Sequence, residues 1–176
     1  NKPFLSMISG YLRRCGAERV TLAPLADRRR KLEKARTILE SADMVFISGG
    51  DVEAGMKVLR ERQILPFLHE LFESGKPFFG SSAGSVMLGR QWVGWEDPND
   101  DATARLFSCM GFAPIFCDAH GEAEEWEELC TLLRLTPEGT FGYGITTGAG
   151  LCVYPDGTLE SLGTPVHCYV HRRGKV

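Results

Sequence analysis

Apolar and polar positions follow one another along the chain in blocks that predict helices and strands in turn. Apolar residues at helical spacing, closed by a glycine, predict a helix over 4–16, and a short apolar run predicts a strand over 18–25. The following blocks predict, in order, a helix over 29–42, a buried strand over 43–51, a helix over 52–75 that Pro66 breaks or kinks, a strand over 76–80 and a helix from Ser82. This alternation predicts an α/β fold with a doubly wound, mostly parallel sheet and helices on both faces.

The second half of the chain is less regular. A polar, turn-rich segment over 91–105 predicts a long loop. A strand over 113–120 that ends at a histidine and a strongly helical run over 122–135 come next. Strands then alternate with turns to the end, and Pro-Asp-Gly-Thr at 155–158 predicts a β-hairpin turn in this C-terminal region. No repeat or linker interrupts the pattern, so we expect a single domain over 1–176.

The composition suits one soluble globular domain with a hydrophobic core, since 43% of the 176 residues are hydrophobic and 24% are charged. A formal net charge of -3 argues against a nucleic-acid partner, and the basic stretch Asp27–Arg36 is typical of a solvated helix face. No segment is apolar enough to cross a bilayer, and no signal-peptide pattern opens the chain. We therefore expect neither nucleic acid nor membrane among its partners.

Six cysteines are present, but their spacing is not typical of a small disulfide scaffold. Cys15, Cys130 and Cys152 each fall inside an apolar periodic segment, where a reduced core cysteine is the ordinary expectation. This usage predicts a reducing, cytoplasmic compartment.

The segment KPFFGSSAGSVMLG, residues 76–89, carries the strongest chemical signal. Gly80–Gly84 matches the pattern G-x-S-x-G with Ser82 at its centre, after an apolar strand and before a helix, which is the setting of a nucleophile elbow. Small neighbours are needed there because the backbone of the nucleophile is strained and the helix passes close to the strand. A glycine-rich turn, or an anion-binding turn without chemistry, remains the alternative.

Another predicted strand ends in Ser-Gly-Gly-Asp at 48–51. Ligands bind at the carboxyl ends of parallel strands, and Gly49 or Gly50 can bring a backbone N–H close to a substrate carbonyl. Asp51 also suits the cap of the next helix, and the two roles are compatible.

A serine nucleophile needs a base at neutral pH, and four histidines are available. His120 ends a strand and precedes a glycine, so it can reach the sheet edge where Ser82 lies. His69 falls in a long helix, while His167 and His171 lie beside arginines near the end of the chain and are expected to be exposed. A loop histidine without a catalytic role is the alternative for His120.

The motifs FISGGD, GSSAGS and IFCDAH, in this order, resemble those of the serine peptidases of the dipeptidase E and cyanophycinase family, over about Phe4 to Val153. The resemblance implies a flavodoxin-like sheet related to class I glutamine amidotransferases. It implies Ser82 as nucleophile, His120 as base, and the N–H groups of Gly50 and Ala83 as oxyanion donors. Family members begin with a further strand, which we expect to be missing before Asn1.

The third member of the triad is open. In the dipeptidase branch the acid comes from the loop between serine and histidine, and Asp97 falls best in the family's alignment. The same loop also offers Glu96, Asp100 and Asp101. In the cyanophycinase branch the acid comes later, where this chain has Thr147. On physical grounds Asp118, two residues before His120 on the same strand face, can also orient the histidine and stabilise its cation.

The resemblance implies a short peptide substrate with an aspartyl residue, either amino-terminal or β-linked. The pocket would then need a cation for that carboxylate, and Arg90 and Arg105 are candidates by position, with Gly49 and Asp51 beside the substrate. Asp51-Val52 departs from both branches, which carry Asp-Gln or Asn-Thr after the double glycine. An inactive ligand-binding member and an amidase or esterase remain alternatives, and a homodimer is possible.

Two other signals carry less weight. Cys117–His120 together with His167–His171 could supply zinc ligands, but strand alternation places His167 and His171 on one face and Cys168 on the other, which disfavours a four-ligand set. The glycine-rich run at 142–148 resembles a dinucleotide loop, but strand and hairpin follow it rather than a helix. We therefore expect neither a metal nor a cofactor.

Overall fold

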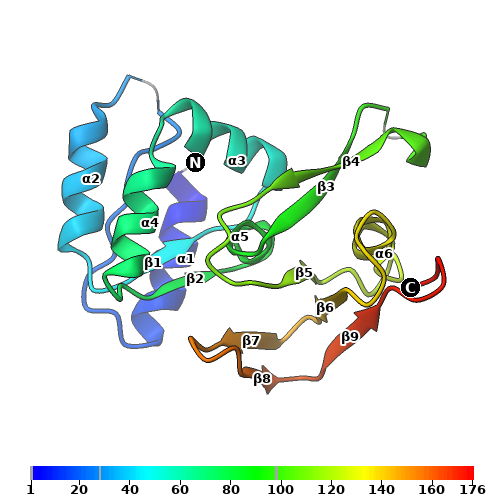
Figure 1. Ribbon diagram of the computed structural model, residues 1–176. Helices are drawn as coiled ribbons and strands as arrows, with labels where there is room; N and C mark the ends of the chain where they lie inside the picture. The colour runs from blue at the N-terminus through cyan, green and yellow to red at the C-terminus, as the bar shows by residue number, and fades with distance from the viewer. Residues whose placement is uncertain (1, 28, 98) are drawn as a thin grey trace. The chain divides into compact units, whose positions relative to one another are not determined.

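The computed structural model describes residues 2–27, 29–97 and 99–176 (Figure 1). The chain divides into two compact units, residues 1–43 and 44–176. The first unit contains two helices, α1 (Lys2–Arg14) and α2 (Leu32–Ser41). The strands that the structure describes, and every residue of the predicted site, belong to the second unit.

The connection between α1 and α2 corrects one prediction. Residues 18–25 form no strand in the described structure, although their composition suggested one. Pro24 lacks a backbone N–H, and a strand needs a neighbour that accepts its hydrogen bonds. Cys15, after α1, is exposed rather than in the core, while Cys130 and Cys152 are only half-buried.

The second unit opens with β1 (Val45–Ile47), α3 (Val52–Glu61), α4 (Leu65–Glu73), β2 (Phe78–Gly80) and α5 (Ala83–Leu88). β1 and β2 are parallel, with Val45 opposite Phe78. The predicted break at Pro66 is confirmed, because this residue lies in the first turn of α4, where a missing N–H removes no helical hydrogen bond.

The segment over 91–105, predicted as a loop, contains strands instead. β3 (Gln91–Trp95) and β4 (Ala104–Ser108) form an antiparallel pair, joined by the short helix η1 (Asp101–Thr103). Only the connection carries the turn-rich residues, while the residues at 92–94 are buried. Their two-sided burial removes the polar–apolar alternation by which a half-exposed strand is recognised.

The remaining elements are β5 (Phe116–Ala119), α6 (Glu127–Arg134), β6 (Phe141–Ile145), β7 (Ala149–Val153), β8 (Leu159–Gly163) and β9 (Val166–Val170). β5 and β6 are parallel, and β9 lies antiparallel to β6. β7 and β8 form an antiparallel hairpin, which confirms the turn predicted at 155–158.

The second unit therefore has a mixed α/β architecture, as predicted. The hydrogen-bonded ladders that the described residues form are β1-β2, β3-β4, β5-β6-β9 and β7-β8, rather than one continuous sheet. A doubly wound parallel sheet thus stays a prediction. Helix α5 contacts β2, β3 and β5, and it lies among these strands in Figure 1.

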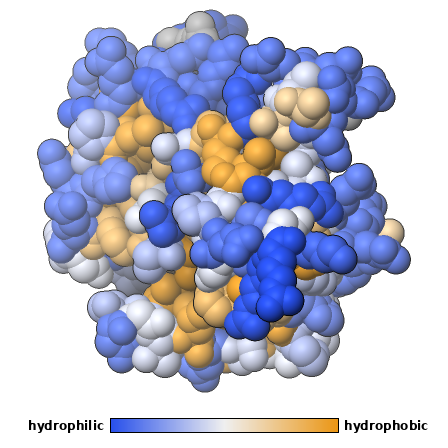
Figure 2. All heavy atoms as spheres, turned by 45° about the vertical axis from the view of Figure 1, so that its right-hand side comes forward, coloured by the Kyte–Doolittle hydropathy of each residue, from blue (hydrophilic) through white to orange (hydrophobic). Residues whose placement is uncertain are grey.

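The core of this unit is built from aliphatic side chains and methionines. Its largest fully buried residues are Met56, Ile64, Val93, Met110, Leu129, Leu132 and Leu133. On the face shown in Figure 2, apolar residues form several separate areas between hydrophilic ones. Among the described residues, no helix has the length and apolar character needed to cross a membrane.

Candidate active site

Ser82 occupies the sharp turn between β2 and α5. Its φ of 56° and ψ of -131° lie in a region that residues with a side chain rarely adopt. Such a conformation costs about 1–3 kcal/mol and persists only where the surrounding packing enforces it. The strained turn predicted from G-x-S-x-G is therefore present at its central serine.

The small residues around Ser82 are required by close backbone contacts. A Cβ on Gly84 would collide with the carbonyl group of Ile47, at 2.7 Å from its carbon atom. A Cβ on Gly80 would collide with the backbone of Gly84, and one on Gly49 would stand 2.9 Å from the Cβ of Ser82. The turn is thus packed directly against the end of β1.

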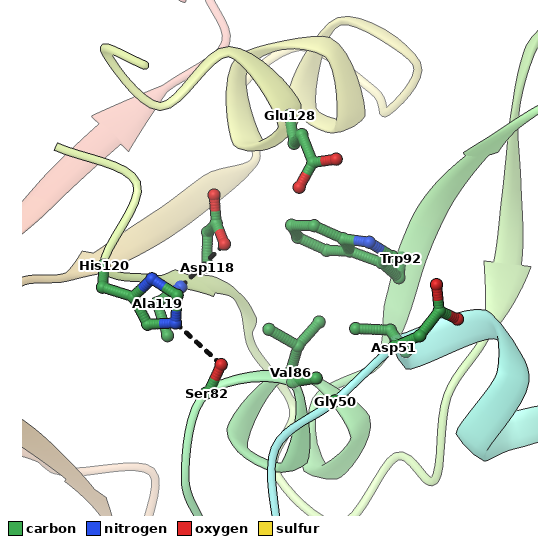
Figure 3. A pocket seen from close by; sticks show the side chains of 11 residues that line it. Gly50, Asp51, Ser82, Val86, Trp92, Asp118, Ala119, His120 and Glu128 are labelled. Carbon is green, nitrogen blue, oxygen red and sulfur yellow. Dashed lines mark hydrogen bonds between the residues drawn. The ribbon is translucent and has the colours of Figure 1, made fainter. Parts of the chain in front are cut away.

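His120 follows the last residue of β5 and contacts Ser82. Its Nε2 lies 2.7 Å from the Ser82 Oγ (Figure 3). The backbone N–H of His120 donates to the Ile145 carbonyl at 2.8 Å, and its φ is 50°. If Nε2 accepts the serine proton, Nδ1 carries the proton of the neutral imidazole. The structure therefore brings together the serine and the histidine that the sequence singled out.

The two residues predicted to supply oxyanion donors lie at the same site. Gly50 and Ala83 both line the pocket beside Ser82. Within the described part of the chain, neither of their N–H groups donates a backbone hydrogen bond. Both donors are consequently available to an oxygen atom of a bound substrate.

The pocket has a volume of about 260 Å³ and a strongly acidic lining. It is lined by Gly50, Asp51, Val52, Ser82, Ala83, Val86, Trp92, Asp118, Ala119, His120 and Glu128. Trp92 is buried and forms one wall, as Figure 3 shows. Asp51 also caps α3, because its Oδ1 accepts a hydrogen bond from the Ala54 N–H at 2.6 Å.

Asp118 is the buried carboxyl group of this pocket, with 8% of its surface exposed. Its Oδ1 accepts a hydrogen bond from the Ala119 N–H at 2.7 Å. Burial raises the pKa of Asp118 to about 6, and the charge of Glu128 adds to this, whereas the Ala119 hydrogen bond and the charge of His120 act against it. Asp118 therefore lies within electrostatic reach of His120.

Glu122, two residues after His120, was not among the site residues predicted from the sequence. Its carboxylate accepts a hydrogen bond from the Thr147 N–H. This bond, first, and also the charge of His120 lower the pKa of Glu122. The only signal for it in the sequence is its nearness to His120, since it begins an acidic run that reads as a solvated helix face. The charge of His120 thus lowers the pKa of a carboxyl group on either side of it in the sequence.

The four acids between Ser82 and His120 are all bonded within the β3–β4 connection. Asp97 accepts a hydrogen bond from the Asn99 N–H, Asp100 from the Ala102 N–H and Asp101 from the Trp95 indole N–H. Glu96 forms an ion pair with Arg105. None of the four is among the residues that line the pocket. The described structure accordingly does not bring Asp97 to His120.

The two arginines proposed for a substrate carboxylate also lie outside the pocket lining. Arg105 pairs with Glu96 at 3.1 Å. The guanidinium of Arg90 lies 5.4 Å from the ring centre of Phe116, at the amino end of β5, whereas His120 follows the carboxyl end. The sequence alone did not show this, because Arg90 lies near the amino end of β5 and His120 follows its carboxyl end, so the length of the strand separates them.

The other histidines differ from His120 in their surroundings. His171 was expected to be exposed, but it is buried, with Nδ1 3.0 Å from the Thr136 carbonyl oxygen. His69 makes an edge contact with Phe112. Across the described ranges, no group of three or more His, Cys, Asp or Glu residues could hold a metal ion.

Comparison with known proteins places the chain in a family. The model of peptidase family S51 matches residues 2–159. Peptidase E of Pasteurella multocida (strain Pm70) is 40% identical over 60 residues, covering 34% of this chain and 26% of that protein. Peptidase E of Haemophilus influenzae (strain PittGG) is 26% identical over 144 residues, covering 76% of this chain and 60% of that protein.

A more distant similarity reaches other proteins. The pyridoxal 5'-phosphate synthase subunit PdxT of Geobacillus sp. (strain WCH70) is 28% identical over 85 residues, covering 48% of this chain and 38% of that protein. The chain spans less than two thirds of the length of each of these relatives. The family match nevertheless covers nearly the whole chain and includes both Ser82 and His120, so the resemblance seen in the three motifs is confirmed and the chain belongs to peptidase family S51.

Proposed function

We propose that this chain carries the active site of a serine-type peptidase that hydrolyses short peptides through an acyl-enzyme. The observation that carries the proposal is the 2.7 Å contact between the Oγ of Ser82 and Nε2 of His120, with Ser82 held in a strained turn. Membership of peptidase family S51 supports the same reaction class. An open pocket beside the pair leaves room for a short substrate.

The first half of the reaction transfers the acyl group to the enzyme. His120 takes the proton of Ser82 at Nε2 while the Oγ attacks the peptide carbonyl carbon. The N–H groups of Gly50 and Ala83 hold the negative charge that develops on the carbonyl oxygen. His120 then gives its proton to the leaving amine, and the peptide bond breaks.

Water completes the cycle. His120 removes a proton from a water molecule, which attacks the acyl-enzyme at the same carbonyl carbon. The oxyanion again lies at Gly50 and Ala83, and collapse of the intermediate returns the proton to Ser82. Both halves use one histidine as base and then as acid, so only one imidazole is needed.

A carboxylate must stabilise the His120 cation in each half. The charge of His120 lowers the pKa values of Asp118 and Glu122, whereas Asp97 is bonded to Asn99. Asp118 is buried and interacts through a medium of low polarity, while Glu122 is exposed and its pKa is lowered, first by the hydrogen bond from Thr147. We assign the orienting role to this pair rather than to Asp97.

The substrate proposed from the family resemblance is a short peptide with an aspartyl residue, amino-terminal or β-linked. The pocket volume of about 260 Å³ supports one residue on the acyl side of the scissile bond. Since Arg90 and Arg105 lie outside the pocket lining, the aspartyl carboxylate has no cationic partner among the described lining residues. Aspartyl specificity therefore rests on the resemblance alone.

Replacement of Ser82 tests the proposed reaction. Ser82→Ala should lower kcat/KM toward Asp-X and β-aspartyl dipeptides by at least about 10³-fold, because the nucleophile is lost. Ser81→Ala, at the exposed neighbouring serine, is the matched control and should retain activity. A fluorophosphonate probe should label the native chain and Ser81→Ala but leave Ser82→Ala unlabelled. Absence of both labelling and turnover in the folded protein would point to an inactive ligand-binding member, and turnover of esters alone to an esterase.

Replacement of the acids tests the assignment around His120. Asp118→Asn and Glu122→Gln should each lower kcat by about 10-fold or more, and the double variant should lose more than either single variant. Asp97→Asn should stay within about threefold of the native rate. The opposite pattern, with only Asp97→Asn impaired, would restore the acid expected from the dipeptidase branch.

A further inference from the structure

Two threonine side chains join the end of β6 to the segment between β8 and β9. Thr146 directly follows β6, and Thr164 lies between β8 and β9. Their Oγ1 atoms are 2.9 Å apart. The Thr146 Oγ1 also lies 2.8 Å from the Pro165 carbonyl oxygen, and the Thr164 Oγ1 lies 3.1 Å from the Thr147 carbonyl oxygen. Thr146 and Thr164 are called the threonine pair below.

The contacts of the threonine pair depend on one another. Each hydroxyl has one proton to donate, whereas the pair makes three contacts that each need a donor. The protons can run from Thr164 through Thr146 to the Pro165 carbonyl. They can also run from Thr146 through Thr164 to the Thr147 carbonyl. Loss of either hydroxyl removes two of the three contacts, so we expect the two side chains to act as a unit.

The backbone that the threonine pair holds contacts the candidate site at two points. The Ile145 carbonyl accepts the His120 N–H at 2.8 Å. Two residues further along, the Thr147 N–H donates to the Glu122 carboxylate. Glu122 and Thr147 are both exposed, so water competes for each of these groups unless the backbone keeps them together. The position of residues 145–147 therefore affects both the His120 backbone and the Glu122 carboxylate.

The charge of Glu122 depends on the same hydrogen bond. The bond from the Thr147 N–H is the largest cause that lowers the pKa of Glu122, and the charge of His120 is a smaller one. A hydrogen bond to the charged form of a carboxyl group favours that form. Displacement of the Thr147 N–H would therefore raise the pKa of Glu122 and free its carboxylate to move relative to His120.

We propose that Thr164 is a positioning residue, which fixes the backbone over 145–147 and thereby holds the Glu122 carboxylate and His120 in place for the reaction at Ser82. This inference rests on the proposed function, because Glu122 is assigned there as one of the two acids that orient His120. Thr164 lies outside the pocket lining and needs no contact with the substrate. It acts through Thr147 and Glu122.

Removal of one hydroxyl tests this role. Thr164→Val keeps the branched shape of the side chain but loses its hydrogen bonds, and it should lower kcat by about 3- to 10-fold with little change in KM. Thr164→Ser keeps the hydroxyl and should stay within about twofold of the native kcat. The double variant Thr146→Val/Thr164→Val should lose no more than about the stronger single variant, because the two hydroxyls act as a unit.

Thr140→Val is the matched control. The Thr140 hydroxyl also donates to a backbone carbonyl, that of Pro137 at 2.7 Å, but it precedes the amino end of β6, whereas Thr146 follows the carboxyl end. This variant should keep the native kcat. Equal losses in Thr140→Val and Thr164→Val would mean that any weakened turn beside β6 lowers activity, which would overturn the positioning role.

A titration followed by NMR keeps this inference separate from the proposed function, because it needs no hydrolysis. The carboxyl carbon of Glu122, assigned with the help of Glu122→Gln, is followed against pH in the native protein and in the variants. In Thr164→Val the pKa of Glu122 should move upward, toward its ordinary value of 4.5. Thr164→Ser and Thr140→Val should leave it where it is in the native protein.

The two readouts together decide between the possible outcomes. An upward shift of the Glu122 pKa and a lower kcat in Thr164→Val support the inference. An unchanged pKa overturns it even if the native protein is an active peptidase, and so does a shifted pKa with a native kcat, because the contact then does not serve the reaction. If the native protein cleaves no peptide, the proposed function fails, while a shifted pKa still supports Thr164 as the residue that holds the Glu122 carboxylate in place.

Discussion

Ser82 and His120 share a property that is visible only at the level of single residues, a positive φ of 56° and 50°. Neither residue is a glycine, so each conformation must be imposed by its surroundings. Because Gly49 and Gly84 have no Cβ, the end of β1 packs directly against the turn at Ser82. The Ile145 carbonyl accepts a hydrogen bond from the backbone N–H of His120. The free energy of packing thus maintains a serine–histidine contact that the unfolded chain would rarely form.

Asp118 makes the stability of the protein depend on pH. Its pKa is raised from 3.8 to about 6, so the folded state binds the proton more tightly than the unfolded state. The corresponding stability is fully present below pH about 4 and is lost as the pH rises through about 6. Asp118→Asn removes this dependence, because asparagine stays neutral and keeps an oxygen for the Ala119 N–H.

The measurement is urea unfolding of both proteins at pH 4.5 and pH 8. Relative to the native protein, Asp118→Asn should gain on the order of 2 kcal/mol in the free energy of unfolding between these two pH values. Glu138→Gln, at an exposed residue, gives the baseline for a change of net charge. A gain that is the same at both pH values would mean that the Asp118 carboxyl is not desolvated in the folded state.

At the scale of elements, the site depends on how closely α5 approaches the end of β1. Gly84→Ala places a Cβ on the Ile47 carbonyl, which belongs to backbone and cannot move aside. We expect the variant to lose about 3 kcal/mol or more, or not to fold, as overpacking against backbone does. The measurement is the urea midpoint of the expressed protein.

The control for this substitution is Gly10→Ala in α1. A Cβ on Gly10 meets no atom within 4 Å, and alanine favours helix over glycine. This variant should be as stable as the native protein or more stable by about 0.5–1 kcal/mol. Unchanged stability of Gly84→Ala would show that α5 and β1 are further apart than the close packing described here requires.

At the scale of the whole molecule, burial divides the cysteines into classes of different reactivity. Burial raises the pKa values of Cys109 and Cys117 to about 12, whereas Cys15 and Cys168 are exposed. Thiolates, not thiols, react with alkylating reagents. Iodoacetamide at pH 8 should therefore modify Cys15 and Cys168 in the native protein and reach the two buried cysteines only after unfolding.

Peptide mass spectrometry over a time course follows each cysteine separately. In the native protein the buried pair should react at least about 100-fold more slowly than the exposed pair. In urea all sites should react at similar rates, which provides the internal control. Alkylation of Cys117 as fast as Cys168 in the native protein would contradict the burial of β5.

The sequence by itself determined the local features of this protein. The glycine spacing around Ser82, the apolar run before it and the helix after it sufficed to predict a strained turn, because each depends on neighbours in the chain. The end of a strand at His120 and the turn at 155–158 are of the same kind. The resemblance of three motifs, in order, was also enough to identify the family.

Only the tertiary structure decided what surrounds this pair. The pairing of β3 with β4 made an antiparallel hairpin of an expected loop, and Asp97 is hydrogen-bonded in the exposed connection of that hairpin. The direction of β5 placed Arg90 away from His120. Glu122 and Glu128 belong to an acidic run in which no local pattern distinguishes one carboxylate from another. Contacts between residues far apart in the chain depend on packing, and packing decided which charges face Ser82.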